Sequence, residues 1–365
     1  MEKVKKLKVK YNDIIVGYLA ELDNGQIAFQ YDEFWIKNGF SISPFSLPLS
    51  DKIYINQKNN FDGLYGVFWD SLPDGWGELI IKRMLAKKGI NYDNLSPLQK
   101  LSLISSNGLG ALTYEPSETD NNSTCDIDLD TLANDARKIL NNEATNVELD
   151  QIYRLGGSSG GARPKAHITI DDEEWIIKFP CLIDPINIGE KEYNANIIAK
   201  QCGININECR LFPSKLCSGY FGSKRFDRIC NKKVHMISLS ALLETSHRVP
   251  NLDYCHLLQV IQNICPNKSD MYEAYRRMCY NVMYHNKDDH GKNFSFIYDE
   301  KINGYMLSPA YDLTSTPDKP EHEMSIMGNG NPTETDLVAI AKKFRLSEAK
   351  CKKIIEEIKN IVNKQ

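Results

Sequence analysis

The first part of the chain alternates apolar and polar residues at every second position. Residues 5–36 follow this pattern, and residues 23–25 (Asp-Asn-Gly) carry the signal of a tight turn between two extended segments. Over residues 63–88 the apolar period lengthens, and residues 73–75 (Pro-Asp-Gly) predict a turn that leads into a helix. Residues 107–114 predict a loop that enters a strand. The chain therefore begins with β structure that gives way to a helix.

The middle of the chain changes composition twice. Residues 115–148 are acidic and rich in Thr, Asn and Ser, and the run 120–123 offers no core residue, so we expect a linker over 119–148. Strand patterns return over residues 153–180 on both sides of a glycine-rich turn. Residues 175–179 predict a short apolar strand that carries one lysine, Lys178.

Helical periodicity dominates after Arg228. It predicts helices over residues 253–263, 271–285 and 346–362, with two strands around a turn at 300–304. A β-rich first half and a helix-rich second half indicate an α+β, two-lobed fold, in which a ligand site is expected at the lobe junction. The predicted segments are 1–118, the acidic linker 119–148, a β-rich core 149–228 and a helical part 229–365.

Composition narrows the classes of function. The chain has 365 residues, 42% of them hydrophobic and 25% charged, as in soluble globular proteins. A net charge of −4 gives no electrostatic basis for binding nucleic acid unaided. No apolar run approaches the roughly 20 residues of a membrane span, and the ten cysteines show no C-x-x-C spacing. We expect a cytoplasmic protein with reduced thiols and no membrane contact.

The strongest chemical signal is the segment 286–296, between a predicted helix and a predicted strand. Asp288 and Asn293 have the D-x-x-x-x-N spacing of a kinase catalytic loop, where the Asp accepts the proton of the substrate hydroxyl and the Asn holds a metal. Asp312 follows the predicted strand pair, as the metal-binding Asp of kinases does. Carboxylate and amide oxygens are ligands that Mg²⁺ prefers. This order of residues predicts phosphoryl transfer.

Two further side chains are candidates for the nucleotide site. Lys178 is placed as the strand lysine that pairs the α- and β-phosphates in kinases, and Glu192 on the next helical segment could hold it. His290 could contact the nucleotide or only orient the catalytic loop. A lone strand lysine is often a solvent-facing residue, but apolar neighbours here indicate burial of Lys178.

The segment 156–165 (Gly-Gly-Ser-Ser-Gly-Gly-Ala-Arg-Pro-Lys) resembles a loop that cradles phosphates, because small residues let backbone N–H groups approach an anion. It matches neither the Walker A pattern nor G-x-G-x-x-G. Taken alone, it is more typical of a flexible turn.

These motifs, in this order, resemble the HipA family of toxin kinases. Residues 68–75 and 108–112 resemble that family's N-terminal subdomain, so the resemblance covers about residues 10–330. The motifs that carry it are Ser158-x-x-Gly161-Ala162-x-x-Lys165, Ile177-Lys178-Phe179-Pro180, Arg225-Phe226-Asp227-Arg228, Asn286-x-Asp288-x-His290-x-x-Asn293 and Ser308-Pro309-x-Tyr311-Asp312.

The resemblance implies a bilobal protein-kinase-like fold with an extra N-terminal subdomain, and a serine/threonine kinase that uses ATP and Mg²⁺. The family more often has an acidic residue where Lys224 stands. The implied roles are catalytic base for Asp288, Mg²⁺ ligands for Asn293 and Asp312, phosphate contacts for Lys178, Ser159, Gly160 and Gly161, adenine hinge for Lys224 to Phe226, ribose contact for Asp227, nucleotide site for His290, and autophosphorylation of Ser158.

The resemblance also implies partners: a protein substrate, which in similar proteins is an aminoacyl-tRNA synthetase, and a helix-turn-helix antitoxin. Two alternatives stay open. A lipid or small-molecule kinase would share the Asp288-x-His290-x-x-Asn293 pattern, which also resembles phosphoinositide kinases. A non-catalytic corepressor that binds an antitoxin and DNA would not need the intact catalytic residues.

Overall fold

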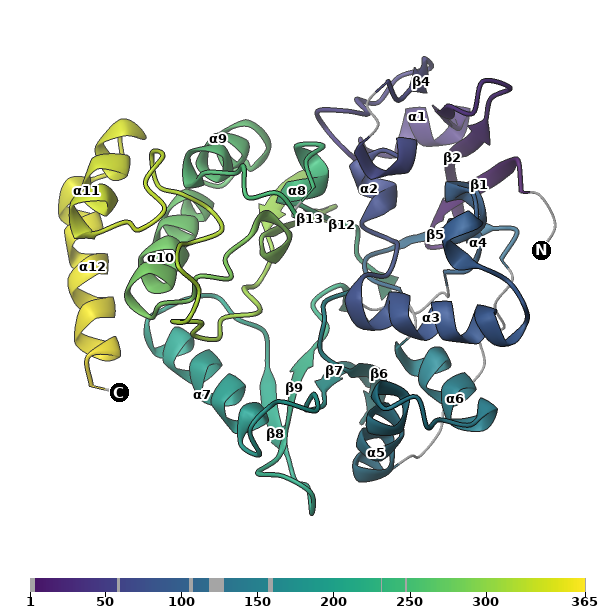
Figure 1. Cartoon of the computed structure of the whole chain (residues 1–365). Helices are drawn as coiled ribbons and strands as arrows, with labels where there is room; N and C mark the ends of the chain where they lie inside the picture. The colour runs from purple at the N-terminus through teal and green to yellow at the C-terminus, as the bar shows by residue number, and fades with distance from the viewer. Residues whose placement is uncertain are drawn as a thin grey trace. The chain divides into compact units, whose positions relative to one another are not determined.

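We describe the protein from a computed structural model of the whole chain (Figure 1). The structure describes residues 4–57, 60–104, 108–117, 128–156, 160–230, 232–246 and 248–364. Contacts divide the chain into two compact units. The first contains Met1–Glu190, Arg210–Ile237 and Ala241–Thr245, and the second contains Lys191–Cys209, Ser238–Ser240 and Ser246–Gln365. Both units combine strands with helices, which confirms the predicted α+β class.

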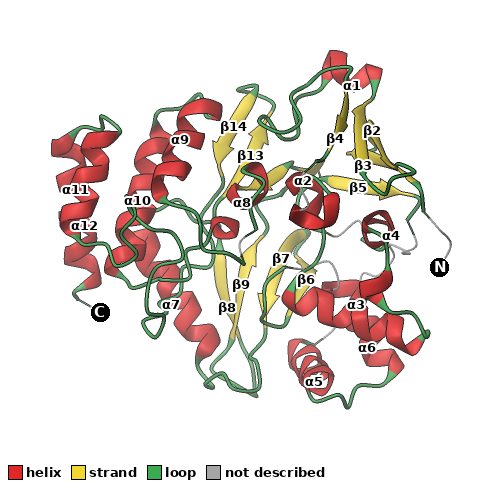
Figure 2. Ribbon diagram, turned by 45° about the horizontal axis from the view of Figure 1, so that its top comes forward, coloured by secondary structure: helices red, strands yellow, loops and turns green. Residues whose placement is uncertain are grey.

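The first unit begins with a five-stranded antiparallel sheet in the order β4-β3-β2-β1-β5 (Figure 2). Along β1, Leu7 and Val9 are buried between exposed lysines, as the alternating pattern predicts. The predicted turn after β2 is confirmed, with Gly25 at φ 81°. The strands are β1 (Lys6–Tyr11), β2 (Ile14–Glu21), β3 (Ile27–Tyr31), β4 (Ile53–Ile55) and β5 (Leu112–Glu115).

Helices lie in the chain between β3 and β5 of this sheet. The helix predicted after residues 73–75 is α3, and Ser96 caps α4 by accepting the backbone N–H of Gln99 while the Gln99 side chain accepts that of Ser96. The helices are α1 (Glu33–Asn38), α2 (Gly66–Trp69), α3 (Gly75–Lys87) and α4 (Pro97–Ser102), with 3₁₀ turns η1 (Asn60–Gly63) and η2 (Tyr92–Asn94).

A second antiparallel sheet of the first unit has the order β6-β7-β9-β8. A tight turn joins β6 to β7, with Asp171 and Asp172 at φ 52° and 60°. The strand predicted at residues 175–179 is β7. The strands are β6 (Lys165–Ile170), β7 (Glu173–Lys178), β8 (Cys209–Phe212) and β9 (Tyr220–Lys224), followed by the short pair β10 (Arg228–Ile229) and β11 (Lys232–Lys233).

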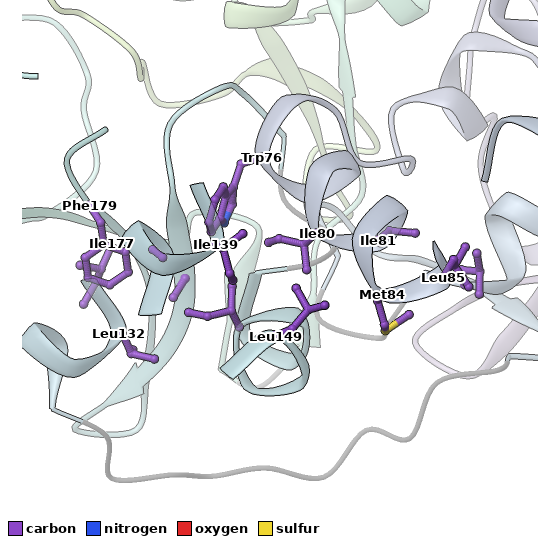
Figure 3. Close-up of a cluster of buried hydrophobic side chains, with 14 of the residues drawn as sticks. Trp76, Ile80, Ile81, Met84, Leu85, Leu132, Ile139, Leu149, Ile177 and Phe179 are labelled. Carbon is purple, nitrogen blue, oxygen red and sulfur yellow. The ribbon is translucent and has the colours of Figure 1, made fainter. Parts of the chain in front are cut away.

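The segment predicted as an acidic linker, 119–148, contains structure that the composition did not reveal. Its described part includes α5 (Leu129–Leu140), and α6 (Asn146–Gly156) begins within it. Leu132 and Ile139 of α5 pack with α3, α6 and the strand residue Ile177 in one apolar cluster (Figure 3). A linker interpretation is therefore wrong for these residues, because an amphipathic helix can bury apolar side chains while its acidic residues face solvent.

The second unit is mainly helical, and the predicted helices correspond to α9, α10 and α12. The predicted strand pair is β13 and β14, joined antiparallel; α11 was not predicted. In Figure 1, α12 lies beside α10. Three elements have residues in both units: α7 (Ile188–Gln201), β12 (Met236–Ser238) and α8 (Leu239–Leu242). The other elements of the second unit are α9 (Tyr254–Ile264), α10 (Ser269–Met283), η3 (Gly291–Asn293), β13 (Ser295–Asp299), β14 (Gly304–Leu307), α11 (Glu334–Lys343) and α12 (Glu348–Val362).

The bounds of the two compact units differ from those of the four segments predicted from the sequence. The first unit takes in 1–118, 119–148 and most of 149–228, because α3, α5 and α6 share one apolar cluster with the second sheet. Within the described residues, no helix has the length and hydropathy that a membrane span requires.

Candidate active site

The predicted catalytic loop, in the second unit, starts where α10 ends. Tyr284 still donates its backbone N–H to Tyr280 (2.7 Å), but His285 has φ 56°, and a residue in this left-handed region ends the helix. The next residue, Asn286, donates its backbone N–H to Asn281 (2.9 Å). The chain therefore leaves the helix in a fixed direction, with the predicted catalytic residues directly after the turn.

Asp288 and Asn293 are joined within this loop. The Asn293 side-chain amide Nδ2 donates to the Asp288 carbonyl oxygen (2.7 Å), and the Asp288 backbone N–H donates to Thr316 Oγ1 (3.1 Å). The backbone of Asp288 is thus held from two sides, while its side chain remains 43% exposed. A carboxylate that is positioned by its backbone and open to solvent can receive a proton from an incoming hydroxyl group.

The neighbouring carboxylate, Asp289, has a different environment. Its side chain is fully buried and accepts hydrogen bonds from the Tyr254 hydroxyl (2.6 Å) and the Glu323 backbone N–H (3.0 Å), and His322 Nδ1 lies 2.9 Å from Oδ2. Burial next to this carboxylate raises the pKa of Tyr254 well above its ordinary value. Asp289 therefore anchors the loop, and of the Asp-Asp pair only Asp288 is exposed to solvent.

Asp312 and Asn293 line the same small cavity, which has a volume of about 10 Å³ and is confined to the second unit. Asp312 has φ 54°, and its side chain is exposed. Asn286 also lines the cavity: its Nδ2 donates to Asn281 Oδ1 (3.0 Å) and to the Asp312 carbonyl (3.2 Å), and its buried Oδ1 has no partner among the described residues. The cavity therefore presents carboxylate and amide oxygens.

These oxygens fit Mg²⁺ bound together with phosphates. In the described part of the chain, no three His, Cys, Asp or Glu side chains form a protein-only metal cluster. Mg²⁺ in nucleotide sites usually takes one or two protein ligands and completes its octahedron with phosphate oxygens and water. Asp312 can supply a carboxylate oxygen, and Asn293 can supply its Oδ1 because its Nδ2 is engaged by Asp288.

His290 is half-buried and precedes the turn η3. Its carbonyl accepts the backbone N–H of Asn293 (2.9 Å). The backbone of His290 thus shapes the loop, and a contact of its side chain with a nucleotide stays a prediction.

The glycine-rich loop lies in the first unit, and its C-terminal end is described. Ser158 and Ser159 lie outside the described residues. The Gly161 carbonyl accepts the backbone N–H of Trp76 (2.9 Å), its N–H donates to Asp74 Oδ1, and the Gly160 carbonyl accepts from Lys165 Nζ. These bonds link the loop to the start of α3.

Gly75 is required at this contact. A Cβ atom at Gly75 would lie 2.6 Å from the Gly161 carbonyl oxygen, and Gly75 has φ +45°, which side chains rarely adopt. The role of Asp74 and Gly75 in holding the glycine-rich loop was missed, because the sequence shows only a turn there.

Lys178 ends β7 in the first unit, opposite Lys165 of β6. Trp175 and Ile177 face the apolar cluster, so the strand alternation directs Lys178 to the other face of the sheet, where it is half-buried and its ammonium lies 5.6 Å from the centre of the Phe221 ring. Its apolar neighbours therefore do not bury it completely. Glu192 is buried in the second unit, and its predicted pairing with Lys178 stays a prediction.

The predicted adenine hinge follows β9. The Arg225 backbone N–H donates to the Glu174 carbonyl (2.8 Å), so this group belongs to the sheet. Lys224 forms an ion pair with Glu173, which balances its charge locally. Phe226 is half-buried. The hinge role of Lys224 and Phe226 stays a prediction.

Asp227 is the centre of a buried charge cluster. It is 3% exposed and accepts from Arg225 (2.7 and 2.9 Å), Arg228 (3.0 Å) and the backbone N–H of Gly110 (2.7 Å). Burial alone would raise the pKa of Asp227, but the two arginines hold it well below its usual range. With both oxygens engaged, Asp227 joins the loop at Gly110 to the second sheet, and this geometry favours a structural role over the predicted ribose contact.

Two family models match the chain. The model described as the HipA N-terminal domain matches residues 7–115, and the one described as the HipA-like C-terminal domain matches residues 157–365, more than half of the chain. The chain belongs to the HipA family. The predicted resemblance is therefore confirmed.

Known proteins agree with membership in the HipA family. A Sinorhizobium fredii protein with the name "Putative kinase Y4dM" is 26% identical over 379 residues, which cover 95% of this chain and 88% of that protein. The HipA structure from the Shewanella oneidensis MR-1 toxin–antitoxin complex of HipA, HipB and operator DNA superposes with a TM-score of 0.73 at 17% identity, over 98% of this chain and 89% of the other. At this identity the likeness shows the fold, which is the kinase-like α+β fold that the resemblance implied.

Proposed function

We propose that this HipA-family chain is an ATP- and Mg²⁺-dependent serine/threonine protein kinase. One observation carries the proposal: the Asn293 amide fixes the backbone of Asp288, whose carboxylate is open to solvent, while Asn293 and Asp312 line one cavity. A proton acceptor beside two oxygen ligands for a metal is the minimum that phosphoryl transfer requires.

In the proposed step, a serine or threonine hydroxyl oxygen forms a bond to the γ-phosphorus of ATP. The bond between that phosphorus and the β–γ bridging oxygen breaks, and its electron pair leaves with ADP. The hydroxyl proton passes to the Asp288 carboxylate. Asn293 and Asp312 would hold Mg²⁺, which when bound neutralises phosphate charge.

The first unit supplies candidates for binding the rest of the nucleotide. Lys178 would pair with the phosphates, and Ser159 and Gly160 would cover them with backbone N–H groups. Gly161 would contribute through the shape of the loop, because its own N–H donates to Asp74 Oδ1. Lys224 with Phe226 would contact adenine through the main chain. The bond from Lys165 to the Gly160 carbonyl and the bond from the Gly161 N–H to Asp74 fix the direction of the loop's C-terminal end.

The family also suggests partners. We propose a helix-turn-helix antitoxin as a binding partner, since one solved structure with the same fold is a HipA in complex with HipB and operator DNA. An aminoacyl-tRNA synthetase is the proposed substrate on the family resemblance alone. Pull-down of the chain with the product of an adjacent helix-turn-helix reading frame tests the first point.

The direct test of the function is transfer of labelled γ-phosphate from Mg-ATP to protein. We expect wild-type protein to consume ATP and to label itself or an added synthetase on serine or threonine. A chain that binds antitoxin and DNA but transfers no phosphate would be a corepressor, and labelling of phosphoinositides instead of protein would favour the lipid-kinase alternative.

Asp312→Asn should weaken binding of Mg-ATP by at least about tenfold, because loss even of an outer-shell partner of a metal typically costs 10–100-fold in affinity. Calorimetric titration with ATP in the presence and absence of Mg²⁺ measures this effect, which should disappear without the metal. Glu356→Gln on the exposed face of α12 is the control. Equal Mg-ATP affinity in wild type and Asp312→Asn would contradict the metal-ligand role.

Autophosphorylation is expected on Ser158, or on its neighbour Ser159. A phosphate there adds nearly two negative charges in a loop proposed to cover phosphates, so activity should fall as occupancy rises. Mass spectrometry after incubation with Mg-ATP measures the occupancy. The Asp288→Asn protein should carry no phosphate, and phosphate on that variant would point to a contaminating kinase.

A further inference from the structure

Residues 316–323, which follow Asp312 in the chain, form hydrogen bonds with the loop that carries Asp288. Thr316 Oγ1 accepts the backbone N–H groups of both Lys287 (2.9 Å) and Asp288 (3.1 Å). In return, Lys287 Nζ donates to the Lys319 carbonyl (2.8 Å), and the Glu323 backbone N–H donates to the Lys287 carbonyl (3.1 Å). These reciprocal bonds hold residues 316–323 against the loop that carries Asp288.

This arrangement places the Lys319 side chain next to the Asp288 carboxylate. Its ammonium lies 2.5 Å from Asp288 Oδ1 and 2.8 Å from Glu323 Oε1. The cation therefore bridges the proposed base and a second carboxylate. Burial would lower the pKa of Lys319, but its hydrogen bonds with Asp288 and Glu323 raise that pKa above its ordinary value, so the ammonium stays charged.

We propose that Lys319 is a positioning residue for phosphoryl transfer: its ammonium orients the Asp288 carboxylate towards the acceptor and offsets the negative charge that phosphates bring to it. This inference rests on the proposed function. No motif singled out Lys319 in the sequence, because its partner lies on the catalytic loop and only the folded chain brings them together.

Charge explains why such a cation is needed. The Asp288 carboxylate must remain ionised and close to a polyanionic phosphate while it accepts a proton, and like charges at this distance repel. If the Lys319 ammonium moved away from the loop, it would lose its ion pairs with both Asp288 and Glu323. Glu323 therefore acts as the tether that keeps Lys319 beside Asp288.

A purely structural role is the competing explanation, since Lys319 and Glu323 form an ordinary i,i+4 ion pair. The chain offers a matched control: Lys353 and Glu357 on α12 form an i,i+4 ion pair at 3.8 Å, with a lysine side chain that is 76% exposed. Lys353→Met removes the same type of pair at a site with no catalytic residue.

The experiment compares Lys319→Met, Lys319→Arg, Glu323→Gln and Lys353→Met in the full chain. We expect Lys319→Met to lower kcat about 30-fold, a fraction of the ~10²–10⁴-fold that a positioned general base contributes, with less than about threefold change in KM for ATP. Lys319→Arg should recover kcat to within about fivefold of wild type because it keeps the charge, Glu323→Gln should lower kcat by a few fold, and Lys353→Met should equal wild type.

A second readout does not depend on activity. Acetylation of lysines by an amine-reactive ester, followed by mass spectrometry, reports how strongly each ammonium is held. Lys319 should react several-fold faster in Asp288→Asn than in wild-type protein, whereas Lys353 should react equally in both. Equal reactivity of Lys319 in the two proteins would show that Asp288 does not hold it.

The outcomes separate the inference from the function on which it rests. Wild-type protein without phosphoryl transfer would overturn both. If the wild type is active and Lys319→Met has an unchanged or increased kcat, only the positioning role is overturned. The positioning role is also overturned if Lys319→Met loses kcat, Lys319→Arg fails to restore it, and the melting temperature falls.

Discussion

Asp288→Asn is expected to lower the rate of phosphate transfer by about 10³-fold, because the substitution removes the proton acceptor and positioned general bases contribute ~10²–10⁴-fold. Affinity for Mg-ATP should change by less than about threefold, since the proposed metal ligands Asn293 and Asp312 remain. The free energy of unfolding should change by less than about 1 kcal/mol because the side chain is 43% exposed. Kinetics of γ-phosphate transfer, calorimetry with Mg-ATP and urea denaturation measure these quantities.

The adjacent residue supplies the matched control. Asp289→Asn makes the same chemical change on a buried side chain, where an amide would present a donor to Tyr254, His322 or the Glu323 N–H. We expect this variant to lose about 1–3 kcal/mol or more of unfolding free energy. Asp288→Asn with wild-type transfer rates would contradict the catalytic role, and an Asp289→Asn protein as stable as wild type would contradict the anchoring role.

Asp227→Asn is expected to destabilise the first unit by about 3–5 kcal/mol, the usual cost of removing one partner from a buried ion pair. Arg225 has a fully buried side chain and Arg228 a nearly buried one, and the substitution leaves both charges facing a neutral amide, while Glu174 stays within 3.5 Å of Arg225 and 3.3 Å of Arg228. Urea denaturation followed by tryptophan fluorescence measures the change, since Trp175 lies in the adjoining sheet.

The control for this variant is an exposed ion pair of the same sheet. Glu173→Gln breaks the pair with Lys224, whose side chains are 30–35% exposed, and should cost less than about 1 kcal/mol. If Asp227→Asn were as stable as Glu173→Gln but raised the KM for ATP, the ribose contact implied by the family resemblance would be supported instead of the structural role.

Local patterns of the sequence were sufficient for part of the regular structure. They were wrong for residues 33–36 and 153–155, which were predicted as extended but belong to the helices α1 and α6. Strand alternation predicted β1 to β3 and β7, helical periodicity predicted α3, α9, α10 and α12, and glycine marked the turn at Gly25. Such signals lie within a few residues of one another, so they can be read without knowing the fold. The acidic composition around α5 concealed a helix, because its buried face consists of only a few apolar residues within a polar segment.

The sequence by itself determined the order of Asp288, Asn293 and Asp312, and with it the family and the expected chemistry. Only the tertiary structure shows that Asp288 is exposed to solvent whereas Asp289 is buried. It also shows that Asp227 forms ion pairs with two arginines and that Lys319 forms one with Asp288. The reason is physical. A side chain's charge state, exposure and role depend on groups that reach it from distant parts of the chain, and no local pattern encodes those neighbours.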